Sequence, residues 1–187
     1  LLSYQPFVAL MFHKPAGCVT ATEDRFQKTV MDYINHPRKK DLFPVGRLDI
    51  DTEGLLFLIN DGALSHRMLS PRHHVPKTYE AQIAGKVTEE DIAAFKEGLD
   101  IGEKRKTLPA QLEILEVNIE TAPVSRIRLT ICEGKFHQVK RMFEARGKKV
   151  TYLKRVCMAG VALDEALEPG SWRELTQEET ERLKESC

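Results

Sequence analysis

Residues 45–59 read VGRLDIDTEGLLFLI, an acid-rich segment that runs directly into a continuous apolar stretch. The apolar part, Leu55 to Ile59, is typical of a short buried strand. The three acids, of which Asp49 is the first, superficially resemble a calcium loop. An EF-hand requires a bidentate Glu at its twelfth position, and counting from Asp49 that position is Asn60. The sequence therefore excludes an EF-hand and leaves the carboxylates for another chemistry.

An extended backbone from Arg47 to Asp51 sorts the side chains into two sets, because successive side chains of a strand point to opposite faces. Arg47, Asp49 and Asp51 then share one face. Leu48 and Ile50 lie on the other face and anchor the segment in the core. A carboxylate beside a guanidinium stays ionised and oriented, as a nucleophile requires. Asp49 is therefore a candidate catalytic group, and the alternative is that both aspartates are ordinary turn residues.

The rest of the chain alternates irregularly between strand and helix signals. Alternating or continuous apolar runs predict strands, and capping residues followed by apolar positions at helical spacing predict helices. The order lacks the regular spacing of β–α–β units, so the predicted fold class is α+β with a mixed sheet. The expected strands are 7–12, 55–59, 77–84, 112–117, 125–132 and 152–157, and the expected helices are 29–34, 63–69, 88–95, 137–146 and one that begins at Thr176.

The charge of the chain is balanced overall but unevenly distributed. The 187 residues include 28 Lys and Arg against 28 Asp and Glu. Eight basic residues and one acid lie between Lys135 and Arg155, whereas residues 164–187 carry eight acids and three basic residues. The segment 66–79 has three basic residues, three histidines and no acid. The two basic segments suit a phosphate-binding surface, and solvated faces with internal ion pairing are the alternative.

Composition also narrows the class of protein. No apolar run approaches the ~18 residues that a membrane helix needs, and the N-terminal residues lack the features of a secretory signal. The chain begins with Leu1 rather than Met, so we expect an upstream part. The four cysteines are scattered without a C-x-x-C pair, which predicts a cytoplasmic setting with neither disulfides nor a zinc site. A chain of this size folds as one domain or two lobes, and a monomer is expected.

Four motifs occur in order along the chain, and they are KPAG at 14–17, GRLDIDTEGLL at 46–56, KTY at 77–79 and EGKFHQVKRMF at 133–143. A single R-L-D is a weak signal, but the set together resembles the signatures of the ribosomal-RNA pseudouridine synthases. Two further segments, SHR at 65–67 and SPRHH at 70–74, resemble the RsuA branch, which modifies small-subunit (16S) rRNA. The resemblance implies a catalytic domain over residues 1–187, with a mainly antiparallel sheet flanked by helices and two lobes around a central cleft. It also implies an S4-type RNA-binding domain upstream of this chain.

The resemblance implies a reaction and a set of roles. Uridine is isomerised by breaking the N1–C1′ bond, turning the uracil and joining C5 to C1′, which requires no cofactor and no metal. Asp49 would attack C1′ or C6, or assist loss of the C2′ proton. Tyr79 would stack on the target base and take part in proton transfer, and Lys135 would pair with Asp49. Arg47 would guide the RNA or assist extrusion of the nucleotide, and Leu153 would form an apolar floor under the uracil.

The same resemblance implies that the basic segments contact RNA. A target base must leave its stack to reach a carboxylate in a cleft, at a cost of a few kcal/mol. Contacts to the flanking phosphates and bases would offset that cost. The expected RNA-binding residues are Arg67, Arg72, His73, His74, Lys77, His137, Gln138, Lys140 and Arg141.

Three hypotheses for the function follow. The first is a pseudouridine synthase that acts on 16S rRNA, where the target of the family is uridine 516. The second is the same chemistry on 23S rRNA. The third is a non-catalytic RNA-binding module for ribosome assembly that uses the same basic cleft. A pure RNA-binding module has no reason to keep the set formed by Arg47, Asp49, Tyr79 and Lys135.

Overall fold

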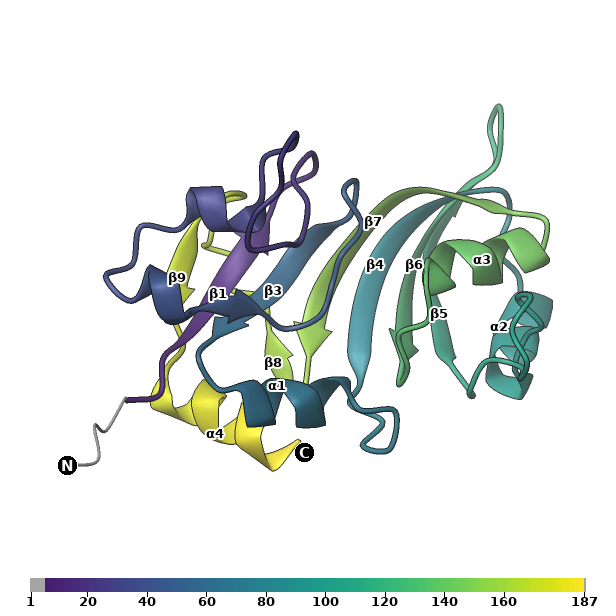
Figure 1. Ribbon diagram of the computed structural model, residues 1–187. Coiled ribbons are helices and arrows are strands. Elements are labelled where there is room, and N and C mark those ends of the chain that lie inside the picture. The colour runs from purple at the N-terminus through teal and green to yellow at the C-terminus, as the bar shows by residue number, and fades with distance from the viewer. Residues whose placement is uncertain (1–5, 187) are drawn as a thin grey trace. The chain divides into compact units, whose positions relative to one another are not determined.

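The computed structural model of the protein describes residues 6–186 (Figure 1). Contacts within the chain divide it into two compact units. Unit 1 comprises the chain up to His73 and from Ala159 onward, and unit 2 is the single stretch His74–Met158. Each unit has antiparallel strands and helices of its own, which confirms the predicted α+β class.

The centre of unit 1 is a pair of buried strands, β1 (Ala9–Lys14) and β3 (Glu53–Ile59). They pair antiparallel from Ala9 opposite Ile59 to Lys14 opposite Gly54. Two short strands extend this pair, since β9 pairs with β1 and β2 pairs with β3. The other elements of unit 1 are the 3-10 helices η1 (Val30–Tyr33) and η2 (Lys39–Asp41), strands β2 (Phe43–Pro44), β8 (Val161–Ala162) and β9 (Trp172–Glu174), and helices α1 (Gly62–Leu69) and α4 (Gln177–Glu185).

Unit 1 agrees with the expected elements in type but differs at their ends. The strand expected at 7–12 is β1, which runs on through His13 and Lys14 because both residues pair with β3 and are buried. The Nδ1 atom of His13 lies 2.7 Å from the carbonyl oxygen of Leu167, so this polar side chain has a partner inside the unit. The helix expected at 29–34 is a single 3-10 turn, which Thr29 begins as its N-cap.

Unit 2 is built on four antiparallel strands in the order β5 (Gln111–Asn118), β6 (Val124–Ile131), β4 (Lys77–Ala84) and β7 (Lys149–Met158) (Figure 1). Strand β4 alternates as the sequence predicts: Lys77, Tyr79, Ala81 and Ile83 are buried, and the residues between them are half-buried or exposed. The register of β4 against β7 shifts between Thr78 and Tyr79, so one residue of β7 is passed over there. All four strands were expected: β4 has the expected ends, and the ends of the other three differ by one to three residues.

Two helices complete unit 2, α2 (Glu89–Glu97) and α3 (Gln138–Ala145). The rings of Phe95 and Phe143, one from each helix, lie 4.8 Å apart between centroids. Asp91 is fully buried, and its carboxylate lies 2.8 Å from Arg146 Nε and 3.1 Å from Lys148 Nζ. This ion-paired cluster fixes the start of α2 to the end of α3. Among the residues described here, no helix has the length and apolar character needed to cross a membrane.

We expect Asp91→Asn to lower the free energy of unfolding by roughly 2–3 kcal/mol at pH 7, because two cations lose their buried carboxylate. Burial opposes ionisation of Asp91, but hydrogen bonds from Arg146, the Thr88 N–H and Lys148 outweigh it and hold the pKa below the ordinary value of 3.8. The contribution of Asp91 is therefore complete above that value and is lost as the pH falls through the lowered pKa. Urea unfolding at neutral and acidic pH measures both effects.

Glu178→Gln is the matched control, since it breaks the exposed Glu178–Arg182 pair of α4. We expect a loss below about 1 kcal/mol for this variant. Equal losses in the two variants would contradict a structural role of the Asp91 cluster.

Candidate active site

Asp49 lies on a tight turn of unit 1 immediately before β3. Arg47 is exposed, Leu48 is buried and Asp49 is half-buried, so the expected alternation holds over these three residues. The N–H of Thr52 donates to the carbonyl of Asp49 at 3.0 Å, which closes a turn. The turn ends the alternation, and Ile50, which was expected to anchor the segment in the core, is 44% exposed. We call residues 47–52 the Asp49 turn.

The buried ammonium of Lys14 holds this turn in place. Lys14 Nζ donates to the carbonyl oxygens of Thr52 at 2.7 Å, Pro15 at 3.0 Å and Ile50 at 3.2 Å. Burial lowers the pKa of Lys14, and the negative charges around it, including Asp51 and Asp49, oppose that shift. The ammonium uses its three donors on backbone carbonyls, two of which belong to the Asp49 turn. Its role is therefore to fix the backbone that presents Asp49.

A second buried group, the hydroxyl of Thr20, forms hydrogen bonds with the backbone of Leu48, the residue before Asp49. Thr20 Oγ1 donates to the carbonyl of Leu48 at 2.9 Å and accepts the N–H of Leu48 at 3.1 Å. Thr20 is 5% exposed, so water does not compete for these bonds. No local sequence pattern predicts this contact, because it joins two loop segments 28 residues apart.

The predicted proximity of Arg47 to Asp49 is not realised as an ion pair. Within residues 6–186 the exposed guanidinium of Arg47 has neither a hydrogen bond nor a salt bridge. A shared face places two side chains in the same direction but does not force a contact between them. Arg47 is thus left accessible to a ligand.

In unit 2, Tyr79, Arg155 and Leu153 lie on one face of the sheet. Tyr79 of β4 stands directly opposite Arg155 of β7, and Ala81 stands opposite Leu153. Residues that face each other across an antiparallel pair share a face, as do residues two apart on one strand. Tyr79 is 8% exposed, Leu153 is 7% exposed and Arg155 is 2% exposed. A phenol, a guanidinium and an isobutyl group thus meet on one largely buried face.

Arg155 is a buried residue of this face that we did not expect from the sequence, where it counted only toward the basic charge of its segment. Burial lowers the pKa of Lys77, and the nearby positive charge of Arg155 lowers it further. The usable signal was the two-residue spacing from Leu153, which puts both side chains on the face of the expected pocket floor.

Lys135 lies on the loop before α3, in contact with other residues of unit 2. Its ammonium donates to the carbonyl of Arg105 at 3.2 Å and lies 3.9 Å from a carboxylate oxygen of Glu133. The side chain is half-buried. The pairing of Lys135 with Asp49, which belongs to unit 1, stays a prediction.

The expected RNA-binding residues differ in their exposure to solvent, and two of them are buried. Lys77 and Gln138 are buried: Lys77 donates to the carbonyl of Val75, and the amide of Gln138 donates to Glu133. Both side chains are bonded within unit 2, and their contact with RNA stays a prediction. Arg141 is half-buried and donates to Glu103, to the carbonyl of Phe136 and to the carbonyl of Ile101. The exposed members are Arg67, Arg72, His73 and His74, and the half-buried ones are His137, Lys140 and Arg141.

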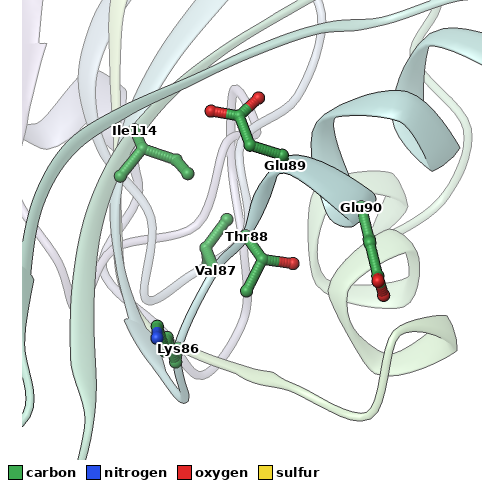
Figure 2. Close-up of a pocket in the computed structure, with 6 residues that line it drawn as sticks. All are labelled: Lys86, Val87, Thr88, Glu89, Glu90 and Ile114. Atoms are coloured by element: carbon green, nitrogen blue, oxygen red, sulfur yellow. The ribbon is translucent and has the colours of Figure 1, made fainter.

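A pocket lies elsewhere in unit 2, at the start of α2 (Figure 2). Lys86, Val87 and Thr88 line it together with Glu89, Glu90 and Ile114, and none of the predicted site residues is among them. The carboxylate of Asp91 already accepts the N–H of Thr88 at 2.9 Å. We therefore assign the pocket no part in the site.

The α+β fold, an aspartate on a fixed turn and two basic segments together suit an RNA-modifying isomerase. A family model described as RNA pseudouridylate synthase matches residues 8–145. The chain belongs to this family, and it is a pseudouridine synthase.

Comparison with individual proteins shows that the chain is a pseudouridine synthase of the RsuA type. The chain is 49% identical over 185 residues to the uncharacterised RNA pseudouridine synthase YtzG of Bacillus subtilis, with 98% of this chain and 76% of the relative covered. It is 46% identical over 174 residues to ribosomal small subunit pseudouridine synthase A of Haemophilus influenzae, with 92% of this chain and 72% of the relative covered.

Solved structures agree with the fold. A crystal structure of a pseudouridylate synthase superposes with a TM-score of 0.88 at 44% identity, covering 98% of this chain and 76% of the other. The human protein called RNA pseudouridylate synthase domain containing 1 matches with a TM-score of 0.59 at 16% identity, covering 98% and 92%. The second likeness shows a common fold alone.

Thr20→Val tests whether the hydroxyl of Thr20 holds the Asp49 turn. Valine matches the shape of threonine but leaves the N–H and carbonyl of Leu48 without their buried partner. We expect the free energy of local opening at the Leu48 amide to fall by roughly 1–3 kcal/mol, measured by hydrogen exchange.

Thr20→Ser retains the hydroxyl, so exchange at Leu48 should stay close to that of the unmodified chain. Thr107→Val is the matched control in unit 2, where Thr107 Oγ1 accepts the N–H of Leu99 at 2.9 Å. Unchanged exchange at Leu48 in Thr20→Val would show that the hydroxyl does not hold the turn.

Proposed function

We propose that this chain isomerises a uridine of small-subunit rRNA to pseudouridine, with uridine 516 of 16S rRNA as the target. The observation that carries the proposal is the Asp49 turn, whose backbone Lys14 and Thr20 fix from two sides. A catalytic carboxylate must be held close to its productive position, and such buried contacts supply that restraint. The similarity to ribosomal small subunit pseudouridine synthases A supports the substrate class.

In the proposed reaction Asp49 supplies the carboxylate. The N1–C1′ bond of uridine breaks, the uracil turns, and a C5–C1′ bond forms. The proton on C5 is lost and N1 gains one, so that atoms and charge balance without any redox change. Asp49 acts by attack on C1′, by attack on C6 or by assisting loss of the C2′ proton, and the three routes share the requirement for an ionised carboxylate.

The face of unit 2 that carries Tyr79 supplies the remaining groups. Tyr79 stacks on the target base and takes part in proton transfer, and Leu153 forms the floor beneath the uracil. Lys135, which lies beside Glu133, is the cation that we assign to pair with Asp49 and keep it ionised.

The exposed cations bind the RNA around the flipped nucleotide. Arg67 lies in the last turn of α1, and Arg72 and His73 follow in the turn after it, so unit 1 presents a compact positive segment. Arg47 is accessible to guide the nucleotide out of its stack. Phosphate contacts of this kind offset the few kcal/mol that unstacking costs, and they weaken as salt rises.

Asp49→Asn tests the catalytic assignment. We expect pseudouridine formation to fall by at least about 1,000-fold, because the amide cannot replace an ionised carboxylate. The free energy of unfolding and RNA affinity should change little, since the backbone contacts of the turn are untouched. Quantifying pseudouridine in a 16S rRNA fragment after incubation with each variant measures the effect.

Asp41→Asn removes the same charge from an exposed site paired with Arg38, and it is the matched control. Normal turnover of Asp49→Asn would favour the alternative of a non-catalytic RNA-binding module. Charge reversal at Lys140 and Arg141 would then be the damaging change.

Cells that lack the protein test the choice of substrate. We expect their 16S rRNA to lack the pseudouridine at position 516, while the modifications of 23S rRNA are unchanged, because the relatives from Haemophilus influenzae and Vibrio cholerae are named ribosomal small subunit pseudouridine synthase A. Mapping pseudouridines in both rRNAs measures this. Loss of a site in 23S rRNA instead would support the alternative substrate with the same chemistry.

We also propose a cytoplasmic setting and a monomeric state. Cys18, Cys132 and Cys157 are all free thiols, which suits a reducing compartment. An S4-type RNA-binding domain upstream of this chain, which the family resemblance implies, would add to the affinity for rRNA.

A further inference from the structure

The loop between β6 and α3 presents an exposed aromatic pair. The rings of Phe136 and His137 are stacked, with 3.7 Å between centroids and 20° between planes. Phe136 is 74% exposed, and His137 is half-buried. One ring supports the other and leaves the phenyl group open to solvent. We call these two residues the aromatic platform.

The backbone beneath the platform is strained. His137 has a φ of 49° and a ψ of 37°, the left-handed region that residues with a Cβ avoid. Strain at a residue other than glycine persists only where the surroundings enforce it, and it is common at ligand-binding positions. Here the left-handed turn is what brings the imidazole alongside the phenyl ring.

The surroundings enforce this conformation from three directions. The carbonyl of Phe136 accepts from Arg141 Nη1 at 2.9 Å. The N–H of Lys135 donates to Gln138 Oε1 at 3.0 Å, and Gln138 Nε2 donates to Glu133 at 2.9 Å. The backbone of Phe136 is therefore fixed while its side chain stays exposed. A rigid exposed ring loses little conformational freedom when a ligand stacks on it.

Positive charge surrounds the platform. Lys135 precedes it, and its ammonium donates to the carbonyl of Arg105 at 3.2 Å. This bond ties the loop to the exposed basic segment 104–106, which reads KRK. Lys140 follows one helical turn after the platform. An exposed aromatic ring among cations is the arrangement by which proteins bind single-stranded nucleic acid.

We propose that the aromatic platform stacks on an unpaired base of the RNA substrate. The inference rests on the proposed function and deepens it, because it names a contact that recognises single-stranded rather than duplex RNA. Phe136 provides the stacking surface, and His137 is a positioning residue that supports the ring. The cations contact the phosphates on either side of the stacked base.

Phe136→Leu and Phe136→Trp, made in the whole chain, test the proposal. The probe is a single-stranded oligouridylate of about ten nucleotides with 2-aminopurine at its centre, a length within the span of single-strand sites. We expect Phe136→Leu to weaken binding about 5- to 100-fold and to abolish the quenching of 2-aminopurine that stacking causes. Phe136→Trp keeps an aromatic ring and should retain both. The dependence of affinity on salt should be the same in all variants, because no phosphate contact is lost.

Phe26→Leu is the matched control, since Phe26 is 88% exposed on a loop of unit 1. We expect it to bind and quench like the unmodified chain, and all variants to unfold at the same urea concentration. Unchanged affinity and quenching in Phe136→Leu would overturn the proposal, and so would equal losses in Phe26→Leu.

Failure of the proposed function is distinguishable from failure of the platform. If the unmodified chain forms no pseudouridine in a 16S rRNA fragment, the proposed reaction is contradicted. The binding comparison still tests whether the platform stacks on a base. If pseudouridine forms but Phe136→Leu binds and quenches normally, only the proposal of the aromatic platform is contradicted.

Discussion

The Asp49 turn depends on one buried ammonium. Lys14 Nζ binds the carbonyls of Pro15, Ile50 and Thr52, so it joins the end of β1 to the segment that leads into β3. Burying a charge is costly, and the cost is acceptable here because each donor has an acceptor and carboxylates lie nearby. A neutral side chain at this position would remove three hydrogen bonds at once. The placement of Asp49 and the packing of unit 1 therefore depend on the same three hydrogen bonds.

The sequence predicted the strands well where hydrophobic periodicity was clear. The alternation of residues 77–84 and the apolar run 55–59 both correspond to observed strands, β4 and β3. The short strands β2, β8 and β9 were missed, since two or three residues are too few to show a period. Strand β1 extends further than expected because His13 and Lys14 find buried partners that lie far away in the sequence.

The site was predictable where a residue's role follows from local pattern, and less so where it follows from distant contacts. Motifs identified Asp49 and Tyr79 as candidates, and the alternation around Leu48 was correct. Ile50 was misplaced because a turn intervenes after Asp49. Thr20 and the burial of Lys77 depend on tertiary contacts that no window of sequence contains.

Burial of Lys14 has a chemical consequence for the whole protein. Acylating reagents and acetyl-transfer enzymes act on amines that they can reach, and the side chain of Lys14 is 0% exposed. Lys104 and Lys106 are exposed and would react first. Covalent neutralisation of surface lysines would thus weaken the proposed contacts with phosphates while the interior of unit 1 remains intact. Loss of nucleic-acid affinity and loss of the native state are, for this chain, chemically separable events.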